Sequence, residues 1–177
     1  RWRLDECYTA LWVGKVINAN WKAVSEAFME AWHSIVTHPQ ILPYTGDANT
    51  RYSMWGDHAN LALTPFGLPS PHLAADNLSE DDIIAPFSRT SGRSASLEGR
   101  KLADGETART AMAETNRANY LDALGYDSSD ISDSEMLDAF TYNIFPNLSP
   151  WGGFVPNIVY RWRPWPDQNA TLMEVRL

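Results

Sequence analysis

Cysteine is almost absent from this sequence: Cys7 is the only one in 177 residues. A single thiol excludes an internal disulfide, and it excludes an iron–sulfur cluster or metal site built from the chain's own cysteines. A reducing, cytoplasmic setting is therefore expected. Cys7 itself is expected to be buried as a small hydrophobe rather than to act as a nucleophile.

Basic residues are also scarce, because 14 Lys and Arg stand against 22 Asp and Glu, for a net charge of −8. An acidic chain has no electrostatic attraction to phosphates, which argues against a nucleic-acid partner. Long apolar runs are missing as well, and none approaches the roughly 20 residues needed to cross a bilayer. Neither a nucleic acid nor a membrane is therefore expected as a partner.

Apolar and aromatic residues, by contrast, are plentiful: 44% of the chain is hydrophobic, and eight residues are Trp. A chain of this size can bury a real core, so residues 1–177 are expected to form a single domain. The chain starts without Met and stops inside the strand-like run Ala170–Leu177. We therefore expect it to be a piece of a longer protein.

Residue patterns along the chain predict strands and helices in mixed order. The hydrophobic periods, turn residues and caps predict strands at Tyr8–Ile17, Arg51–Trp55, Ala59–Thr64, Ala139–Phe145, Val155–Arg163 and Ala170–Leu177, and helices at Trp21–Thr37, Glu106–Leu124 and Ser132–Asp138. The polar stretch 80–105 is expected to be a mobile loop. Strands joined by short turns pair antiparallel. The order therefore predicts an α+β fold, an antiparallel sheet with helices on one face.

The predicted helix Trp21–Thr37 carries the most specific constellation of polar residues. Glu26, Glu30 and His33 are spaced i, i+4 and i+7, so one helical face would hold all three. His38 falls off that face, but Pro39 ends the helix there and lets the second imidazole return toward the first. Phe28 and Trp32 would share another face and pack into the core.

Two imidazoles with a nearby carboxylate suit a first-row metal that keeps open positions, as in the ferrous sites that activate O2. Adjacent carboxylates would orient the imidazoles and tune the metal. Two alternatives stay open on the residues alone. Glu26 and Glu30 could be solvated surface charges, and a histidine in a helix is usually not a ligand.

Several segments resemble one family. Asn20-Trp21-Lys22, the run Glu26–His33 and Thr37-His38-Pro39 are similar to the iron-binding signature of Rieske-type ring-hydroxylating oxygenase α subunits. Tyr142–Asn147 and Tyr160–Pro164 resemble later strands of the same catalytic domain. The similarity extends from about Tyr8 to Leu177.

This resemblance implies a helix-grip (START-like) fold with an apolar cavity and a mononuclear Fe(II). It implies that His33 and His38 are iron ligands and that Glu30 replaces the family's bridging Asp. Glu26 matches the family's Glu-or-Asn position just before it. No residue of this chain matches the family's third ligand, an Asp beyond the last strand.

The resemblance also implies a reaction: O2 is reduced at the iron, and a small aromatic or apolar substrate is hydroxylated. Electrons come from NAD(P)H through a reductase or ferredoxin and a 2Fe–2S cluster in a Rieske domain. The Cys and His pairs that hold that cluster are not in this sequence. We therefore expect the chain alone to be inactive, and we expect a homo-oligomer, a trimer in the family.

Other polar residues are weaker candidates. His58 in a predicted hairpin turn and His72 in a loop are expected not to be ligands, although His58 could line a pocket mouth. Arg161 and Arg163 alternate along one strand and are expected to form a solvated face rather than a basic groove. Large side chains that could line a pocket are Trp12, Trp55, Phe66, Phe145, Trp151 and Phe154.

A second class of function also fits this sequence. The helix-grip fold serves non-enzymatic modules that bind an apolar ligand, so the fold alone does not imply catalysis. A third possibility is a stable fragment with no function of its own. Measuring the iron content of the purified chain would distinguish the oxygenase from the apolar-ligand module and from the fragment without function.

Overall fold

The computed structural model describes residues 2, 4–73, 78–90, 97 and 100–177. The chain divides into two compact units. The first unit comprises Arg1–Glu30, Arg51–Leu63 and Ala139–Leu177, and the second comprises Ala31–Thr50 and Thr64–Asp138. The chain passes several times between the two units, and the single domain expected from the length stays a prediction.

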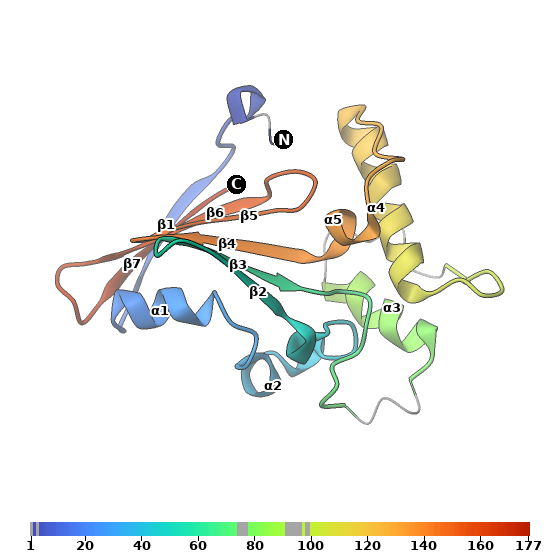
Figure 1. Cartoon of the computed structure of the whole chain (residues 1–177), viewed down its shortest axis with the longest axis horizontal. Helices are drawn as coiled ribbons and strands as arrows, with labels where there is room; N and C mark the ends of the chain where they lie inside the picture. The colour runs from blue at the N-terminus through green and yellow to red at the C-terminus, as the bar shows by residue number, and fades with distance from the viewer. Residues whose placement is uncertain (1, 3, 74–77, 91–96, 98–99) are drawn as a thin grey trace. The chain divides into compact units, whose positions relative to one another are not determined.

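An antiparallel sheet dominates the first unit. Its seven described strands have the order β1-β7-β6-β5-β4-β3-β2 (Figure 1). The strands are β1 Trp12–Ile17, β2 Arg51–Trp55, β3 Ala59–Thr64, β4 Ala139–Ile144, β5 Leu148–Trp151, β6 Ile158–Pro164 and β7 Thr171–Arg176. The predicted α+β fold with an antiparallel sheet is confirmed, and the β2–β3 hairpin has the predicted bounds.

Three strands differ from the prediction, and one of them, β6, begins at Ile158 rather than at Val155. The first strand begins at Trp12 rather than Tyr8, because the regular ladder ends there: Ala10 N and Leu11 N both donate to one carbonyl, Leu177 O, at 2.7 and 3.2 Å. Strand β5 was missed, since it has four residues and contains Pro150, a residue that ordinarily argues against a strand. Its Ser149 Oγ donates to Tyr142 O at 2.6 Å, which fastens it to β4.

One helix of the first unit, α1 (Trp21–Ala27), lies against β6 and β7. Its start is fixed by Asn20, whose side-chain oxygen accepts a hydrogen bond from Lys22 N at 2.9 Å. A short 3₁₀ turn, η1 (Leu4–Glu6), precedes the sheet. Cys7 follows this turn and is exposed, so the prediction that it is buried was wrong. The segment that carries it lies before β1 and outside the strands.

The regular elements described for the second unit are helical. They are α2 Ser34–Thr37, α3 Glu80–Thr90, α4 Ala108–Leu124 and α5 Asp133–Leu137, with 3₁₀ turns η2 Pro39–Ile41 and η3 Asp47–Asn49. Their core is the buried cluster Tyr44, Ile83, Ile84, Phe87, Leu97, Ala108, Ala111, Met112 and Leu137. None of the helices that the structure describes is long and apolar enough to cross a membrane.

Helix α3 corrects one prediction, because Glu80–Thr90 was taken as the start of a mobile loop. The helix is explained by Ile83, Ile84 and Phe87, which bury their side chains together on one side of a polar segment. Residues 91–96 and 98–99 of the predicted loop lie outside the described residues.

Helix α4 follows its sequence signals closely. Thr107 caps its start by accepting from Thr110 N, and Gly125 ends it in the left-handed conformation at φ 68°. Ser132 caps α5 in the same way, through Glu135 N. Both predicted helices are confirmed to within a few residues.

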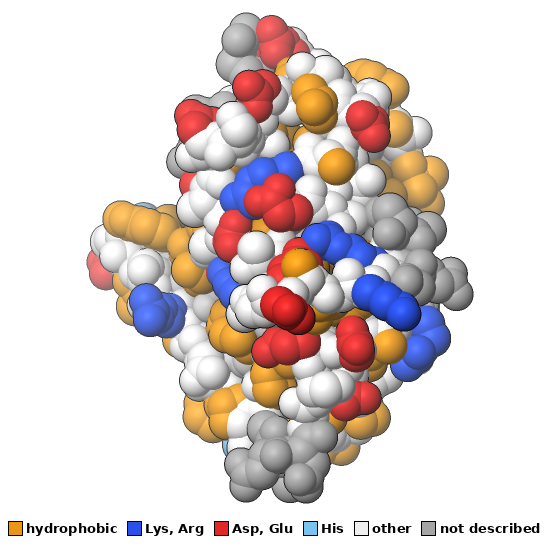
Figure 2. Space-filling model, turned by 90° about the vertical axis from the view of Figure 1, so that its right-hand side faces the viewer, with side chains coloured by type: hydrophobic (Ala, Val, Ile, Leu, Met, Phe, Trp, Pro, Cys, Tyr) orange, Lys and Arg blue, Asp and Glu red, His pale blue; other side chains and the backbone are white. Residues whose placement is uncertain are grey.

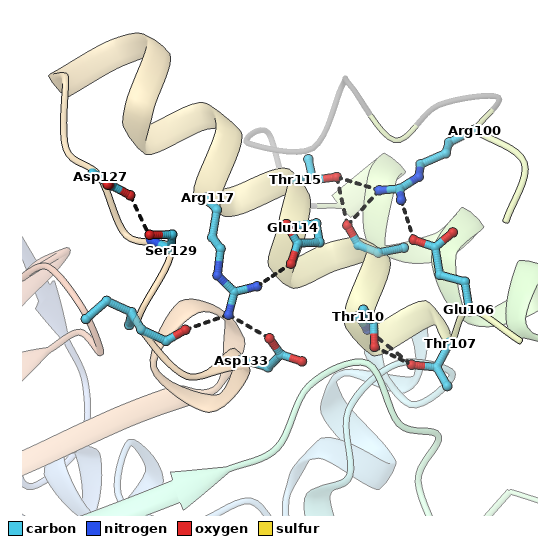
Figure 3. A network of polar contacts seen from close by, with 12 residues as sticks. Arg100, Glu106, Thr107, Thr110, Glu114, Thr115, Arg117, Asp127, Ser129 and Asp133 are labelled. Atoms are coloured by element: carbon cyan, nitrogen blue, oxygen red, sulfur yellow. Dashed lines mark hydrogen bonds and ion pairs between the residues drawn. The ribbon is translucent and has the colours of Figure 1, made fainter. Parts of the chain in front are cut away.

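Two arginines fasten the segments on either side of α4 to that helix (Figure 3). Arg100 donates to Ala111 O at 3.0 Å and forms an ion pair with Glu106. Arg117 donates to Ile131 O at 2.6 Å and to Asp133 Oδ1 at 2.7 Å. Most of the chain's acidic excess lies in this unit, and Figure 2, which looks onto its helices, shows Asp and Glu side chains spread over the surface.

Candidate functional site

The predicted helix Trp21–Thr37 is broken into two helices, so this prediction was wrong. Helix α1 ends at Ala27, and α2 begins at Ser34. The last turn of α1 tightens, since Phe28 N donates to Ser25 O at 3.1 Å and Met29 N donates to Glu26 O at 2.9 Å. The residues from Met29 to His33 form turns and no regular helix.

Aromatic packing explains the break. The Phe28 ring lies 5.0 Å from Tyr160, 5.2 Å from Trp162 and 6.0 Å from Trp151, measured between ring centroids. Contacts with strands more than 120 residues away outweigh the modest helix propensity of this segment. Trp32, which was expected to share a core face with Phe28, is 77% exposed because the chain has turned by then.

Two imidazoles bracket the one-turn helix α2. His33 is its N-cap and His38 its C-cap, and their ring centroids lie 5.2 Å apart with the planes at 71°. Backbone contacts hold both ends. His33 O accepts from Thr37 N at 2.9 Å and from Thr37 Oγ1 at 2.8 Å, and His38 N donates to Ser34 O at 3.0 Å.

The proline after His38 acts as predicted. The backbone of His38 has left the helical region, at φ −131° and ψ 48°, and η2 begins at Pro39. Proline disfavours the helical conformation in the residue before it, so α2 stops after Thr37 and the second ring turns back. The prediction that the two imidazoles come together is confirmed, and their dependence on Pro39 stays a prediction.

The spacing of the two rings fits a shared metal ion. Two imidazoles bound to one metal at about 2.1 Å bring their centroids to roughly 4.5–5.2 Å, for a nitrogen–metal–nitrogen angle of about 90–110°. The observed 5.2 Å lies at the upper end of that range. His33 is half-buried and His38 exposed, so one ring is anchored while the other is accessible.

The described part of the chain holds no group of three or more His, Cys, Asp or Glu side chains arranged to bind a metal ion. Within that part, His33 and His38 are therefore candidate ligands as a pair and not as members of such a group. A facial triad needs a carboxylate in addition.

The two glutamates do not share a helical face with His33. Glu26 is exposed on α1, and Glu30 is half-buried in the turn that follows. Both belong to the first unit, whereas His33 and His38 belong to the second. The i, i+4, i+7 argument that joined them fails, because the helix on which it depended ends at Ala27.

The other two histidines lie outside this pair. His58 is in the β2–β3 turn with its ring 5.8 Å from that of Phe145. His72 is exposed in a turn where its backbone N donates to Ser70 Oγ at 3.2 Å. That neither binds a metal stays a prediction.

Arg161 and Arg163, the two basic residues of β6, both contact the carboxylate of Glu174. Arg161 and Arg163 are each about two-fifths exposed, and both donate to Glu174 Oε2, at 2.7 and 3.1 Å from their Nε atoms. Burial raises the pKa of Glu174, but the hydrogen bonds and charges of the two arginines outweigh it and hold that pKa below its ordinary value. Nothing in the strand pattern of the sequence indicated this partner.

The aromatic residues considered as pocket lining differ in their surroundings within each unit. Phe66 belongs to the second unit and packs beside Tyr44 in its core. Trp151 packs on Phe28 in the first unit, whereas more than half of the surface of Trp12 and Trp55 is exposed. Phe145 is likewise more than half exposed.

A seven-stranded antiparallel sheet with α1 on one face, together with two imidazoles at the ends of one helical turn, defines an α+β domain of the helix-grip type with a candidate metal site. A family model of the ring-hydroxylating α subunit catalytic domain matches residues 1–177, and the chain belongs to this family. The family is that of an oxygenase catalytic domain, hence an oxidoreductase. No curated protein matches the chain.

Proposed function

We propose that the chain binds a mononuclear Fe(II) through His33 and His38 and hydroxylates an aromatic or apolar substrate. The observation that carries the proposal is the 5.2 Å separation of the two rings, in a chain that belongs to the ring-hydroxylating family. When bound, Fe(II) supplies the position at which O2 is reduced. The chain's own residues hold and orient the two imidazoles.

The backbone of α2 supports this role for the histidines. A helix of one turn whose caps are both ligands fixes the distance between the ligands, because its hydrogen bonds must break before the rings separate. Ser34 is buried, and its carbonyl accepts from His38 N, so the turn is anchored at its base. Rigid support of this kind is what holds ligands in productive geometry.

Glu30 and Glu26 are proposed as the acids that serve this site. By the family resemblance, Glu30 would bridge the Rieske cluster of a neighbouring subunit and the iron, and Glu26 would take the Glu-or-Asn position just before it. The family resemblance of the segment Asn20–Pro39 supports both roles, and the half-burial of Glu30 is consistent with a functional carboxylate.

The electron source lies outside this chain in the proposal. One cysteine cannot hold a Rieske cluster, so a separate Rieske domain carries the 2Fe–2S centre. A reductase or ferredoxin that draws on NAD(P)H reduces that centre. We further propose a cytoplasmic location and a homo-oligomeric assembly, as the family resemblance implies.

Anaerobic equilibrium dialysis against Fe(II) tests the proposal. The wild-type chain should bind one iron, and His33→Ala and His38→Ala should each weaken binding at least tenfold. His58→Ala and His72→Ala are matched controls that should bind as tightly as wild type. Iron binding that survives both ligand substitutions would refute the assignment. A chain that takes up an apolar compound but no iron would favour the non-enzymatic binding module.

A further inference from the structure

A line of polar side chains crosses the sheet of the first unit. Tyr160 of β6 is paired with Ser149 of β5, and the neighbouring pair Leu148–Ile144 places Ser149 opposite Asn143 of β4. Residues directly opposite each other in antiparallel strands project from the same face of the sheet. Three adjacent strands therefore present a polar side chain at one level.

The line extends to β3. Phe145 N donates to His58 O at 2.7 Å. In an antiparallel register, two residues after His58 lie opposite two residues before Phe145, so Asn60 is across from Asn143. We call Asn60, Asn143, Ser149 and Tyr160 the polar row. Met29 Sδ lies 4.0 Å from Asn60 Nδ2, so the row lies on the face that bears the end of α1. From there the chain continues directly into the proposed iron-binding segment.

Aromatic rings flank the polar row on that face. Tyr160 and Trp162 are stacked with centroids 5.5 Å apart, and Trp151 lies 5.0 Å from Tyr160. The Phe28 ring packs against all three. Burial in this cluster raises the pKa of the Tyr160 hydroxyl. The surroundings of the row are thus apolar and rich in flat π surfaces.

Asn143 is the member of the row whose hydrogen bonding is incomplete. It is 9% exposed, and its Oδ1 atom has no hydrogen-bond partner among the described residues. Ser149, by contrast, donates to Tyr142 O at 2.6 Å and accepts from Trp151 Nε1 at 2.9 Å. Trp162 is fully buried beside the row, and its Nε1 likewise has no partner in the described part of the chain. Buried polar atoms without partners are rare in native proteins, and each calls for an explanation.

We propose that Asn143 determines substrate specificity by hydrogen bonding a polar substituent of the aromatic ring that lies on this face. The ligand is then a substituted aromatic, with a hydroxyl or comparable group, rather than a bare hydrocarbon. A flat ring suits the Phe28, Trp151 and Tyr160 surfaces, and the substituent completes the hydrogen bonding of the buried amide. The inference rests on the proposed function only in taking this ligand to be the substrate.

Two probes of matched shape test the role of Asn143: 1-naphthol and 1-methylnaphthalene, which differ by a hydroxyl in place of a methyl. Their dissociation constants are measured by equilibrium dialysis on metal-stripped protein. The wild-type chain should bind 1-naphthol about tenfold more tightly, since a buried amide left unpaired penalises the methyl analogue. Asn143→Leu should abolish this preference.

Two further variants keep the test decisive. Asn143→Asp retains an oxygen that accepts from the hydroxyl, so it should keep the preference even if Asn143→Leu folds poorly. Asn169→Leu makes the same change at an exposed turn and should behave as wild type. Equal affinity of wild type for the two probes, failure to bind either, or an unchanged preference in Asn143→Leu would overturn the proposal. Because metal is absent, these outcomes are independent of iron binding, so either proposal can fail while the other stands.

Discussion

His33 and His38 stand at the two ends of a single helical turn, with their ring centroids 5.2 Å apart. A regular helix would have separated them, because five residues correspond to about 140° of rotation. Because α2 has only one turn and Pro39 follows His38, the two rings are not separated in this way. The spacing of the two imidazoles is therefore set by where α2 ends.

Replacing Pro39 tests that dependence. In Pro39→Ala, His38 is free to adopt the helical conformation and α2 to lengthen, which carries the second ring away from the first. We expect affinity for Fe(II) to fall about tenfold, or ~1.4 kcal/mol, with little change in the melting temperature. Pro71→Ala, at an exposed loop proline, is the control and should leave affinity unchanged. An unaltered affinity in Pro39→Ala would show that the helix end does not position His38.

Glu30 is predicted to act in electron delivery rather than in metal binding. In the assembled oxygenase with its reductase, Glu30→Gln should retain iron but lower the turnover number by about 10²-fold, the scale of losing a positioned ionisable group. Glu30→Asp, which restores the acid, should recover part of the rate. Iron content and product formation are measured on the same preparations. Normal turnover in Glu30→Gln would exclude this role.

The close approach of Gly67 to α4 predicts an unusual sensitivity to substitution. Gly67 has φ 75°, and a Cβ there would lie 2.8 Å from Arg109 Cα. That arginine is fixed by Asp138, whose Oδ1 accepts a hydrogen bond from Arg109 Nη1 at 2.6 Å. The hydrogen bond raises the pKa of Arg109 and outweighs burial, which lowers it. The Cβ of Gly67→Ala should therefore clash with the backbone of Arg109, which is held in place in α4.

Gly105 is a matched control for that substitution. It has a similar φ of 80°, but a Cβ there meets nothing within 4 Å. Gly105→Ala should cost about 1–2 kcal/mol of unfolding free energy, the penalty of the left-handed conformation alone. Gly67→Ala should cost at least about twice as much, as measured by chemical denaturation. Equal losses would mean that the contact with Arg109 is of no consequence.

The buried carboxylate of Glu174 predicts a pH dependence of stability. Its pKa is held below the ordinary value of 4.5 by Arg161 and Arg163, which outweigh the effect of burial. A carboxyl whose pKa is depressed in the folded state contributes stability above its unfolded pKa, and that contribution is lost as the pH falls through the folded pKa. The free energy of unfolding should therefore decrease as the pH is lowered from about 5.

Glu174→Gln isolates this effect. The variant should lose about 1–2 kcal/mol at neutral pH, because two guanidinium groups lose a charged acceptor. Its stability should also vary less than that of wild type between about pH 5 and pH 3. Glu135→Gln is the comparison, because it changes a surface carboxylate at the start of α5 that accepts a hydrogen bond from Ser132 Oγ at 3.0 Å. Parallel pH profiles for wild type and Glu174→Gln would contradict the assignment.

Local signals in the sequence predicted the elements whose causes are local. The β2–β3 hairpin, the two ends of α4 and the stop at Pro39 follow from turn glycines, caps and proline chemistry. Each of these depends on residues within a few positions of the element. The motif Asn20–Pro39 likewise indicated the two histidines correctly as a pair in space.

Long-range contacts explain what the sequence could not predict. Helix α1 stops because Phe28 packs on strands far along the chain, and that stop undid the expected face of Glu26, Glu30 and His33. The oxygen of Asn143, which has no partner among the residues that the structure describes, depends on strand register, and no local pattern specifies that register.

The central claim is that His33 and His38 bind one iron together, and X-ray absorption at the iron edge tests it most directly. In the Fe(II)-loaded chain the account predicts scattering from two imidazole rings with iron–nitrogen distances of about 2.1 Å. Either single alanine variant, loaded with excess iron, should show one ring at most, while His58→Ala and His72→Ala should show two. A spectrum without imidazole scattering, or one that neither His33→Ala nor His38→Ala alters, would contradict the account.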